Sequence, residues 1–192
     1  LAVVVIVGVL AAGLRSGDVN AQVNPPAVSD NTPADESEAL ETSRNNLQTL
    51  GLAMHNYHQE HGHFPPAVVA GKDGQTHSWR VALLPYLGQK ELYEKYRLDE
   101  PWDSESNQSV LKQIPSVYRA PQDAEDSSHT SYFVFSCEGT PFSGSEGVRI
   151  RDFMDGTSNT ILVVEVKMAV PWTKPQDIDY PAEEFDEEFT GW

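Results

Sequence analysis

The pattern of hydrophobic and polar residues divides the chain into one uniformly apolar segment, one amphipathic segment and many short mixed ones. Residues 1–14 carry no charge and consist almost entirely of Val, Leu, Ala, Ile and Gly. They are fewer than the roughly 20 apolar residues that span a bilayer, so we expect a transmembrane anchor whose first residues lie upstream of Leu1. Two alternatives are the apolar region of a signal peptide, cleaved near residues 19–21, and a buried core helix.

Residues 15–32 are rich in Asn, Ser, Pro and Asp and lack apolar periodicity, which is typical of a flexible linker. A helix is predicted to follow, because Thr32 can cap it and Pro33 suits its first turn. This helix should cover residues 33–61 and stop at Gly62. Its apolar residues recur at helical spacing and form one face for packing on its own domain. They are Leu40, Leu47, Leu50, Met54 and Tyr57.

The middle and the end of the chain predict short elements. β-Branched and aromatic runs indicate strands, and brief apolar-polar periods between turn residues indicate helices. Because helices come first and strands later, without β-α-β alternation, we expect an α+β fold with a mainly antiparallel sheet. The predicted elements are helices at 78–87, 90–96 and 104–114 and strands at 130–136, 148–150 and 160–167.

The globular domain is therefore expected to cover residues 33–175 and to be followed by an acidic segment, residues 176–192. Seven carboxylates and no basic residue lie between Asp177 and Glu188. Such a run is typical of a solvated segment that is not a binding site. No closing element precedes Trp192, so the natural chain is expected to continue beyond it.

Charge and cysteine content narrow the classes of function. The chain has 29 acidic and 13 basic residues, a formal net charge of -16. This surface repels phosphate backbones, so no nucleic-acid partner is expected. The one cysteine, Cys137, cannot form an internal disulfide and is interpreted as a small apolar residue in a strand.

Several sequence blocks, taken in order, resemble a bacterial family described as domain of unknown function 1559. Its members are often labelled prepilin-type or general-secretion pseudopilin-like proteins. The resemblance covers residues 44–175 and implies a hydrophobic N-terminal helix and an exported domain without established catalytic activity. It also implies a pilin-like arrangement, a long N-terminal helix packed on the sheet with short helices inserted between. The blocks are residues 45–58, 62–66, 78–87, 98–107 with Pro115, Tyr118 and Pro121, 155–165 and 169–175.

The chain departs from this family pattern in two places. The family commonly has a Gly-Phe-Thr-Leu-x-Glu type prepilin signal before the apolar helix, and here this signal is absent or lies upstream of Leu1. The linker at 15–32 also separates two pieces that form one continuous helix in pilins. The departures favour a tethered domain over a subunit of a filament. The C-terminal histidine and Asp-Gly motif of the family is missing as well.

Histidines are the first candidate for a metal site. Two of them are one helical turn apart, a spacing with which two imidazoles can bind one metal ion. No nearby cysteine or third helical ligand completes a tetrahedral set, and only His77 or His129 could supply one from another segment. Structural or surface histidines without bound zinc are therefore expected. The four clustered residues are His55, His58, His61 and His63.

Three carboxylates beside Trp102 are the candidate for glycosidase chemistry, since paired carboxylates next to an aromatic ring suit acid–base catalysis and sugar stacking. The favoured interpretation is the start of a helix, capped by Asp103 or Ser104 with the indole packed inward. Contact with a carbohydrate through Trp102 or Trp79 is the alternative. The carboxylates are those of Asp99, Glu100 and Asp103.

Two further segments have weaker candidates. Residues 155–160, Asp-Gly-Thr-Ser-Asn-Thr, offer oxygen ligands for calcium but lack the spacing of an EF-hand, so a turn held by side-chain hydrogen bonds is expected. Ser136 and Cys137 form no recognisable nucleophile elbow.

The sequence as a whole predicts a non-enzymatic, membrane-anchored protein with its domain outside the cytoplasm of a bacterium, in the periplasm or at the cell surface. Residues 1–14 contact the membrane, and protein or extracellular-matrix partners are expected. No catalytic, cofactor-binding or metal-binding residue is assigned. The alternatives are an extracytoplasmic binding module for a carbohydrate or a divalent cation and, less favoured, a secreted hydrolase.

Overall fold

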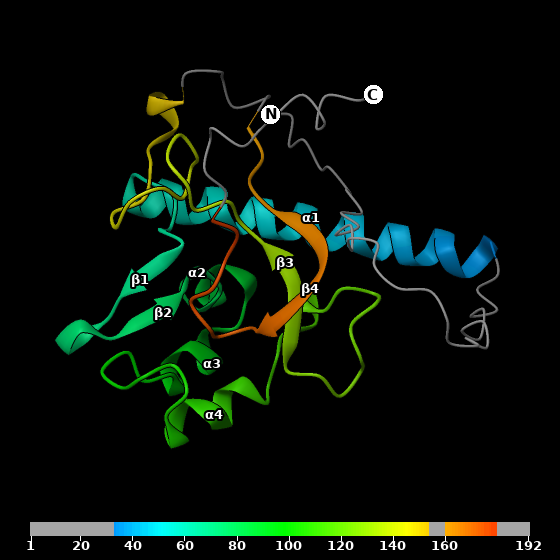
Figure 1. Ribbon diagram of the computed structural model, residues 1–192, viewed down its shortest axis with the longest axis horizontal. Helices are drawn as coiled ribbons and strands as arrows, with labels where there is room; N and C mark the ends of the chain where they lie inside the picture. Colours follow the sequence, from blue (N-terminus) through cyan, green and yellow to red (C-terminus); the bar gives the residue numbers. More distant parts are fainter. Residues whose placement is uncertain (1–32, 154–159, 180–192) are drawn as a thin grey trace, which may run out of the picture.

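The computed structural model describes residues 33–153 and 160–179 of the chain (Figure 1). Helices and strands are mixed, and the predicted α+β class is confirmed. Four short 3-10 turns connect the main elements. In chain order the helices and strands are α1 (Pro33–His61), β1 (Val68–Ala70), β2 (Thr76–Ser78), α2 (Trp79–Ala82), α3 (Lys90–Lys95), α4 (Glu105–Leu111), β3 (His129–Phe133) and β4 (Val164–Pro171).

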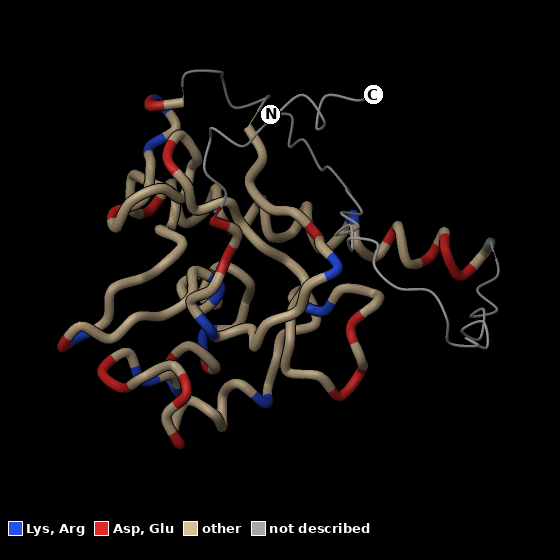
Figure 2. The backbone as a smooth tube through the Cα atoms, in the orientation of Figure 1, with Lys and Arg blue, Asp and Glu red and all other residues tan. Residues whose placement is uncertain are grey.

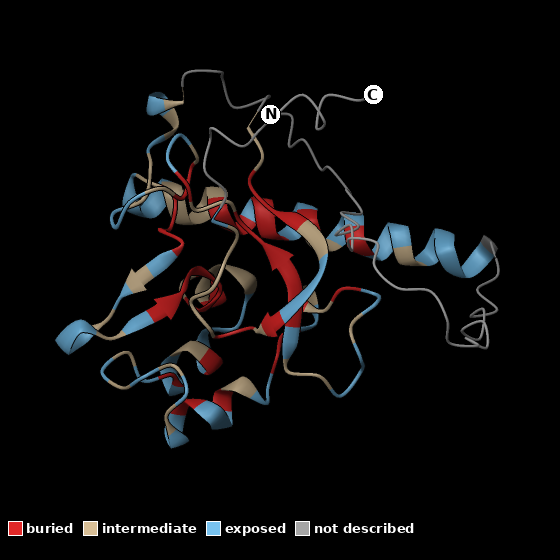
Figure 3. Cartoon of the chain, viewed as in Figure 1, coloured by how far each residue is buried: buried red, intermediate tan, exposed pale blue. Residues whose placement is uncertain are grey.

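Helix α1 has the predicted bounds, and its two parts differ in environment. From residue 34 to residue 42 every residue except Ala39 is exposed, and this end projects beyond the body of the molecule (Figures 1 and 3). From Ser43 onward one face packs on the core, with Leu47, Leu50 and Met54 almost fully buried. Gly62 ends the helix in the left-handed region at φ 81°, and its N–H donates to the His58 carbonyl oxygen at 2.8 Å.

The strands form two separate antiparallel pairs. Strand β1 pairs with β2 in a hairpin, and β3 pairs with β4. The β3–β4 register shifts between Thr130 and Tyr132, which leaves residues 166–169 as a bulge. Phe135 also forms a parallel bridge with Ile178, so a short third segment lies beside β3.

Three strand predictions need correction. The expected strand at 130–136 is β3, which ends at Phe133. The expected strand at 160–167 begins at Val164 and continues to Pro171, because pairing with β3 sets its bounds. The expected strand at 148–150 is wrong: these residues belong to a loop and to a 3-10 turn, Ile150–Asp152. Their backbone bonds go to Phe64 and His58 and not to a neighbouring strand. The β1–β2 hairpin was not predicted.

Two of the short helices, α2 and α4, begin at a serine that caps them. Ser78 caps α2 and accepts from the Arg80 N–H at 3.3 Å, and Ser104 caps α4 and accepts from the Asn107 N–H at 3.2 Å. The helix predicted over 78–87 is divided into α2 and a 3-10 turn, Leu84–Leu87, since Pro85 cannot donate within a continuous helix.

Large aromatic side chains fill the core between α1, α2 and the β3–β4 pair. Tyr118 and Trp172 stack with ring centroids 5.7 Å apart, and Trp79 contacts Tyr118 edge to face. Tyr118 also donates from its hydroxyl to the Arg80 carbonyl oxygen at 2.8 Å. The red ribbon in Figure 3 marks this interior.

A buried ion pair connects the core to the end of the described chain. Arg80 Nη2 lies 2.9 Å from Asp177 Oδ1, with side-chain exposures of 0% and 2%. The expectation of a solvated acidic segment from residue 176 is therefore wrong for Asp177. The neighbouring carboxylates in the sequence suggest that Asp177 is exposed to solvent. Arg80, far away in the sequence, determines instead where its carboxylate lies. Residues 180–192 lie outside the described part of the chain.

The predicted anchor at 1–14, the linker at 15–32 and most of the turn at 155–160 also fall outside the described residues. Within residues 33–153 and 160–179, none of the helices combines the length and the apolar character needed to cross a membrane.

Candidate functional site

An open groove of about 760 Å³ lies where α1 ends. We call it the α1 groove. Its apolar side comes from Pro66 and from Val69 and Ala70 of β1, and its opposite wall is the segment 145–149. Tyr57, His63 and Asp152 complete the lining.

The wall formed by 145–149 is fixed by its backbone. Gly147 adopts φ 73°, and a Cβ atom there would collide with the Phe64 carbonyl oxygen, so only glycine fits. The Phe64 N–H donates to the Val148 carbonyl oxygen at 2.9 Å. Two residues after Val148, the Ile150 N–H donates to Nε2 of His58 at 3.2 Å. Helix α1 and the segment after it thus hold the loop in one position.

Tyr57 lies at the centre of an aromatic cluster. Its ring is 4.1 Å from the His61 ring, and it meets the rings of His63 and Tyr86 edge to face at 5.9 and 5.6 Å. The ring is half-buried, and burial raises the pKa of its hydroxyl, with a smaller contribution from Tyr93. The cluster fixes the tyrosine in the groove.

The four clustered histidines make structural contacts. His61 Nε2 lies 2.9 Å from the Tyr86 hydroxyl, which itself donates to Glu60, and His63 Nδ1 donates to the Phe64 carbonyl oxygen. His58 accepts through Nε2, so its proton is on Nδ1. Burial lowers the pKa of His55 and of His58 and favours their neutral forms, and a neighbouring histidine adds to each shift.

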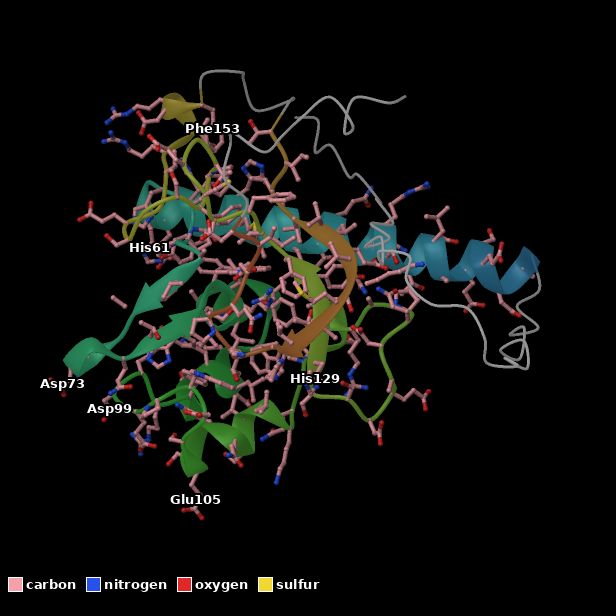
Figure 4. The ribbon with its side chains drawn as sticks, in the orientation of Figure 1. His61, Asp73, Asp99, Glu105, His129 and Phe153 are labelled. Carbon is pink, nitrogen blue, oxygen red and sulfur yellow. The ribbon has the colours of Figure 1, made fainter. Side chains whose placement is uncertain are left out.

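No group of three or more metal-ligating side chains converges within residues 33–153 and 160–179. His77 is buried in another part of the domain, where Nδ1 bonds to the Tyr96 hydroxyl and Nε2 donates to the Leu98 carbonyl oxygen. His129 lies at the exposed start of β3, well apart from His61 (Figure 4). The two histidines from other segments therefore do not join the cluster at the end of α1.

Charged side chains of the groove lie on its loop wall. Arg149 Nε donates to Asp152 Oδ2 at 2.8 Å, and this hydrogen bond lowers the pKa of Asp152. Glu146 is exposed beside them. Groove residues 145–152 were not singled out from the sequence. The sequence predicted only a strand at 148–150 in this segment, which does not indicate what the segment faces.

The three carboxylates beside Trp102 lie in different environments. Asp99 and Asp103 are exposed, and Glu100 accepts from the Ser106 hydroxyl at 3.3 Å (Figure 4). The centre of this turn is the buried Asn107 side chain, which bonds to both the N–H and the carbonyl of Arg97. As predicted, Ser104 caps the helix that follows.

The alternative of sugar contact through Trp79 is wrong, because this indole is fully buried and donates from Nε1 to both Asp177 oxygens at 3.0 and 3.1 Å. Cys137 is buried, and the Ser136 hydroxyl donates to the Ile178 carbonyl oxygen at 3.3 Å. Both are structural positions. Within residues 155–160, only Thr160 is described.

Comparison with known proteins gives one match. Residues 41–146, more than half of the 192-residue chain, match the model of a family described as "Protein of unknown function (DUF1559)". The sequence blocks at 155–165 and 169–175 lie beyond the matched range. No curated protein and no solved structure shows significant similarity to the chain. On the strength of this match, together with the ordered blocks between residues 45 and 121, the chain belongs to the DUF1559 family.

Proposed function

We propose that this protein is a membrane-tethered, extracytoplasmic domain of pseudopilin-like architecture, which acts in the bacterial envelope through contacts with proteins or matrix and not through catalysis. The observation that carries the proposal is the unequal use of α1. Its later part is built into the core, whereas its first three turns project from the body, and the apolar residues 1–14 precede this part in the sequence.

The projecting part of α1 has the properties of a spacer. Residues 34–42 are about 14 Å long at the rise of an α-helix. Four acidic residues of this part, Asp35, Glu36, Glu38 and Glu41, give it a negative surface (Figure 2). An acidic, exposed helix between an apolar segment and a folded body suits a domain kept away from a surface of anionic lipids.

The packed part of α1 supports the comparison with pilins. Asn46 donates from Nδ2 to the Tyr132 hydroxyl of β3 at 3.2 Å and to the Arg119 carbonyl oxygen at 2.9 Å. Leu47 and Leu50 fill the interior next to these bonds. A long first helix that crosses the β-strands with one face and projects with its other end is the arrangement that the proposal takes from pilins.

The test is fractionation of bacteria that produce the protein from its natural gene with a C-terminal epitope tag. We expect the tag in the membrane fraction and its loss when protease is added to intact spheroplasts. The double variant Val5→Arg/Val9→Arg should release the protein from membranes, because each arginine at the centre of a span costs about 2.5–3.5 kcal/mol. The matched control is Val23→Arg/Val28→Arg in the linker, which should stay in the membrane fraction. Recovery of the unaltered chain in the cytosol contradicts the proposal.

A further inference from the structure

We propose that the α1 groove is a binding site for a neutral saccharide. The inference concerns the end of α1 near Tyr57, not its projecting first turns, and does not depend on where the protein is located. It replaces the earlier expectation of sugar contact through Trp79, which is buried, and assigns recognition to a surface built by Tyr57 and the segment 145–152.

Size and lining are the first argument. A groove of about 760 Å³ falls within the range of about 300–1,000 Å³ that is usual for small-molecule sites. Pro66, Val69 and Ala70 give it an apolar side, and Tyr57 adds a half-buried aromatic ring. The C–H face of a sugar ring is apolar and its edges are polar, so one ligand can satisfy both sides of the groove.

Charge is the second argument, because the groove carries charges of both signs. Glu146 and Asp152 disfavour an anion, and Arg149 disfavours a cation. The Arg149 guanidinium uses Nε for Asp152 and has further N–H donors, while carboxylates only accept. Adjacent hydroxyl groups of a sugar donate and accept in turn, which matches a wall with donors and acceptors side by side.

Pre-organisation is the third argument. Three rings hold Tyr57, and the loop wall is fixed by Gly147 and by the bond from Phe64 to Val148. Among residues 33–153 and 160–179, the Tyr57 hydroxyl and the Glu146 carboxylate have no hydrogen-bond partner. Both groups can therefore form hydrogen bonds with a ligand. A fixed site with unused polar groups loses little conformational entropy when a ligand binds.

The experiment is saturation-transfer NMR on the whole 192-residue chain, in a detergent without a sugar headgroup. The probes are glucose, galactose, mannose, N-acetylglucosamine and their β-linked disaccharides, with glucuronate as the anionic comparison. We expect transfer to at least one neutral sugar, with Kd on the order of 1 mM, and weaker transfer to glucuronate. The double variant Glu146→Gln/Arg149→Gln should weaken binding at least about tenfold, and Tyr57→Phe should weaken it about threefold.

The matched control is Glu138→Gln, which removes an exposed carboxylate outside the groove and should leave Kd unchanged. Because Glu146 and Arg149 are also exposed, the double variant should keep the melting temperature of the unaltered protein, which shows that lost binding is not lost folding. The proposal is overturned if no neutral sugar binds at about 50 mM, if glucuronate binds more tightly than every neutral sugar, or if the double variant binds as well as the unaltered chain.

Discussion

Two ion pairs with nearly the same length lie in opposite environments in this protein. Arg80 and Asp177 are 2.9 Å apart in the interior, with side-chain exposures of 0% and 2%. Arg149 and Asp152 are 2.8 Å apart at the α1 groove, with exposures of 53% and 41%. Distance therefore does not distinguish them. What differs is how much water each charge has lost and how many other groups replace it.

The interior pair is embedded in a complete set of bonds. Asp177 accepts from Arg80, from the Trp79 indole and from the Val134 N–H, and Arg80 donates to the Tyr132 carbonyl oxygen at 2.6 and 3.2 Å. Burial raises the pKa of Asp177, and the Arg80 charge and these N–H donors act in the opposite direction. Removing one partner would leave the other charge without water or a counterion. The groove pair stays in contact with solvent and is open to a ligand.

Asp177→Asn is expected to give the largest effect. It leaves the Arg80 charge buried and unpaired, which should lower the free energy of unfolding by about 3–5 kcal/mol. Urea denaturation followed by tryptophan fluorescence measures this loss. The matched control, Asp152→Asn, should not change stability measurably, since solvent screens the exposed pair. Equal losses in both variants would show that burial does not separate the two pairs.

Gly147→Ala is expected to give an intermediate effect through the wall of the groove. Gly144 and Gly147 adopt almost the same backbone, φ 74° and 73°, so alanine costs about 1–2 kcal/mol at either position. Only at position 147 does the new Cβ meet a backbone atom, the Phe64 carbonyl oxygen, and this adds about 1–3 kcal/mol. Thermal melting of both variants measures the difference. If Gly144→Ala is as destabilising as Gly147→Ala, the contact between the new Cβ and the Phe64 carbonyl oxygen does not reduce stability.

The smallest effect expected is a pH dependence at the end of α1. Burial lowers the pKa of His58 below 6.5, with a further contribution from His63, and burial likewise lowers the pKa of His55. The unfolded chain therefore binds protons more readily, so this part of the stability is present above pH 6.5 and is lost as the pH falls through the folded-state pKa values. Protonated His58 can no longer accept from the Ile150 N–H.

Chemical denaturation between pH 7.5 and 5 tests this dependence. His58→Gln should flatten it, because an amide oxygen can accept the same hydrogen bond without titrating. His129→Gln, at an exposed strand end, serves as the control and should leave the slope unchanged. An identical slope in the unaltered protein and in His58→Gln would show that His58 does not cause the pH dependence of stability.

The parts of the fold that could be predicted are those whose signals are local. Pro33 and Gly62 mark both ends of α1, and Ser78 and Ser104 mark the caps of two short helices. The β1–β2 hairpin has strands of only three residues, too short for a period-two pattern to be visible, and its turn at Lys72–Gly74 places Asp73 at positive φ.

The groove and the buried ion pair could not be predicted because their parts are far apart in the sequence. Val148 meets Phe64, and Ile150 meets a histidine 92 positions earlier. Asp177 sits in an acidic run whose composition indicates solvent, yet it pairs across 97 positions with Arg80. Hydrophobic periodicity carries no information about such contacts, so the histidines appeared as a possible metal cluster when their main partners are rings and backbone groups.

The position of Asp177 also constrains how the protein can be made. A polypeptide that emerges N-terminus first presents Arg80 long before its counterion, and closing so long a loop is slow. Until residue 177 has left the ribosome, the Arg80 guanidinium has no carboxylate with which to form its buried ion pair. The interior can therefore be sealed only after residue 177 has been made, and a chain terminated before this aspartate should be less stable and more exposed to proteases.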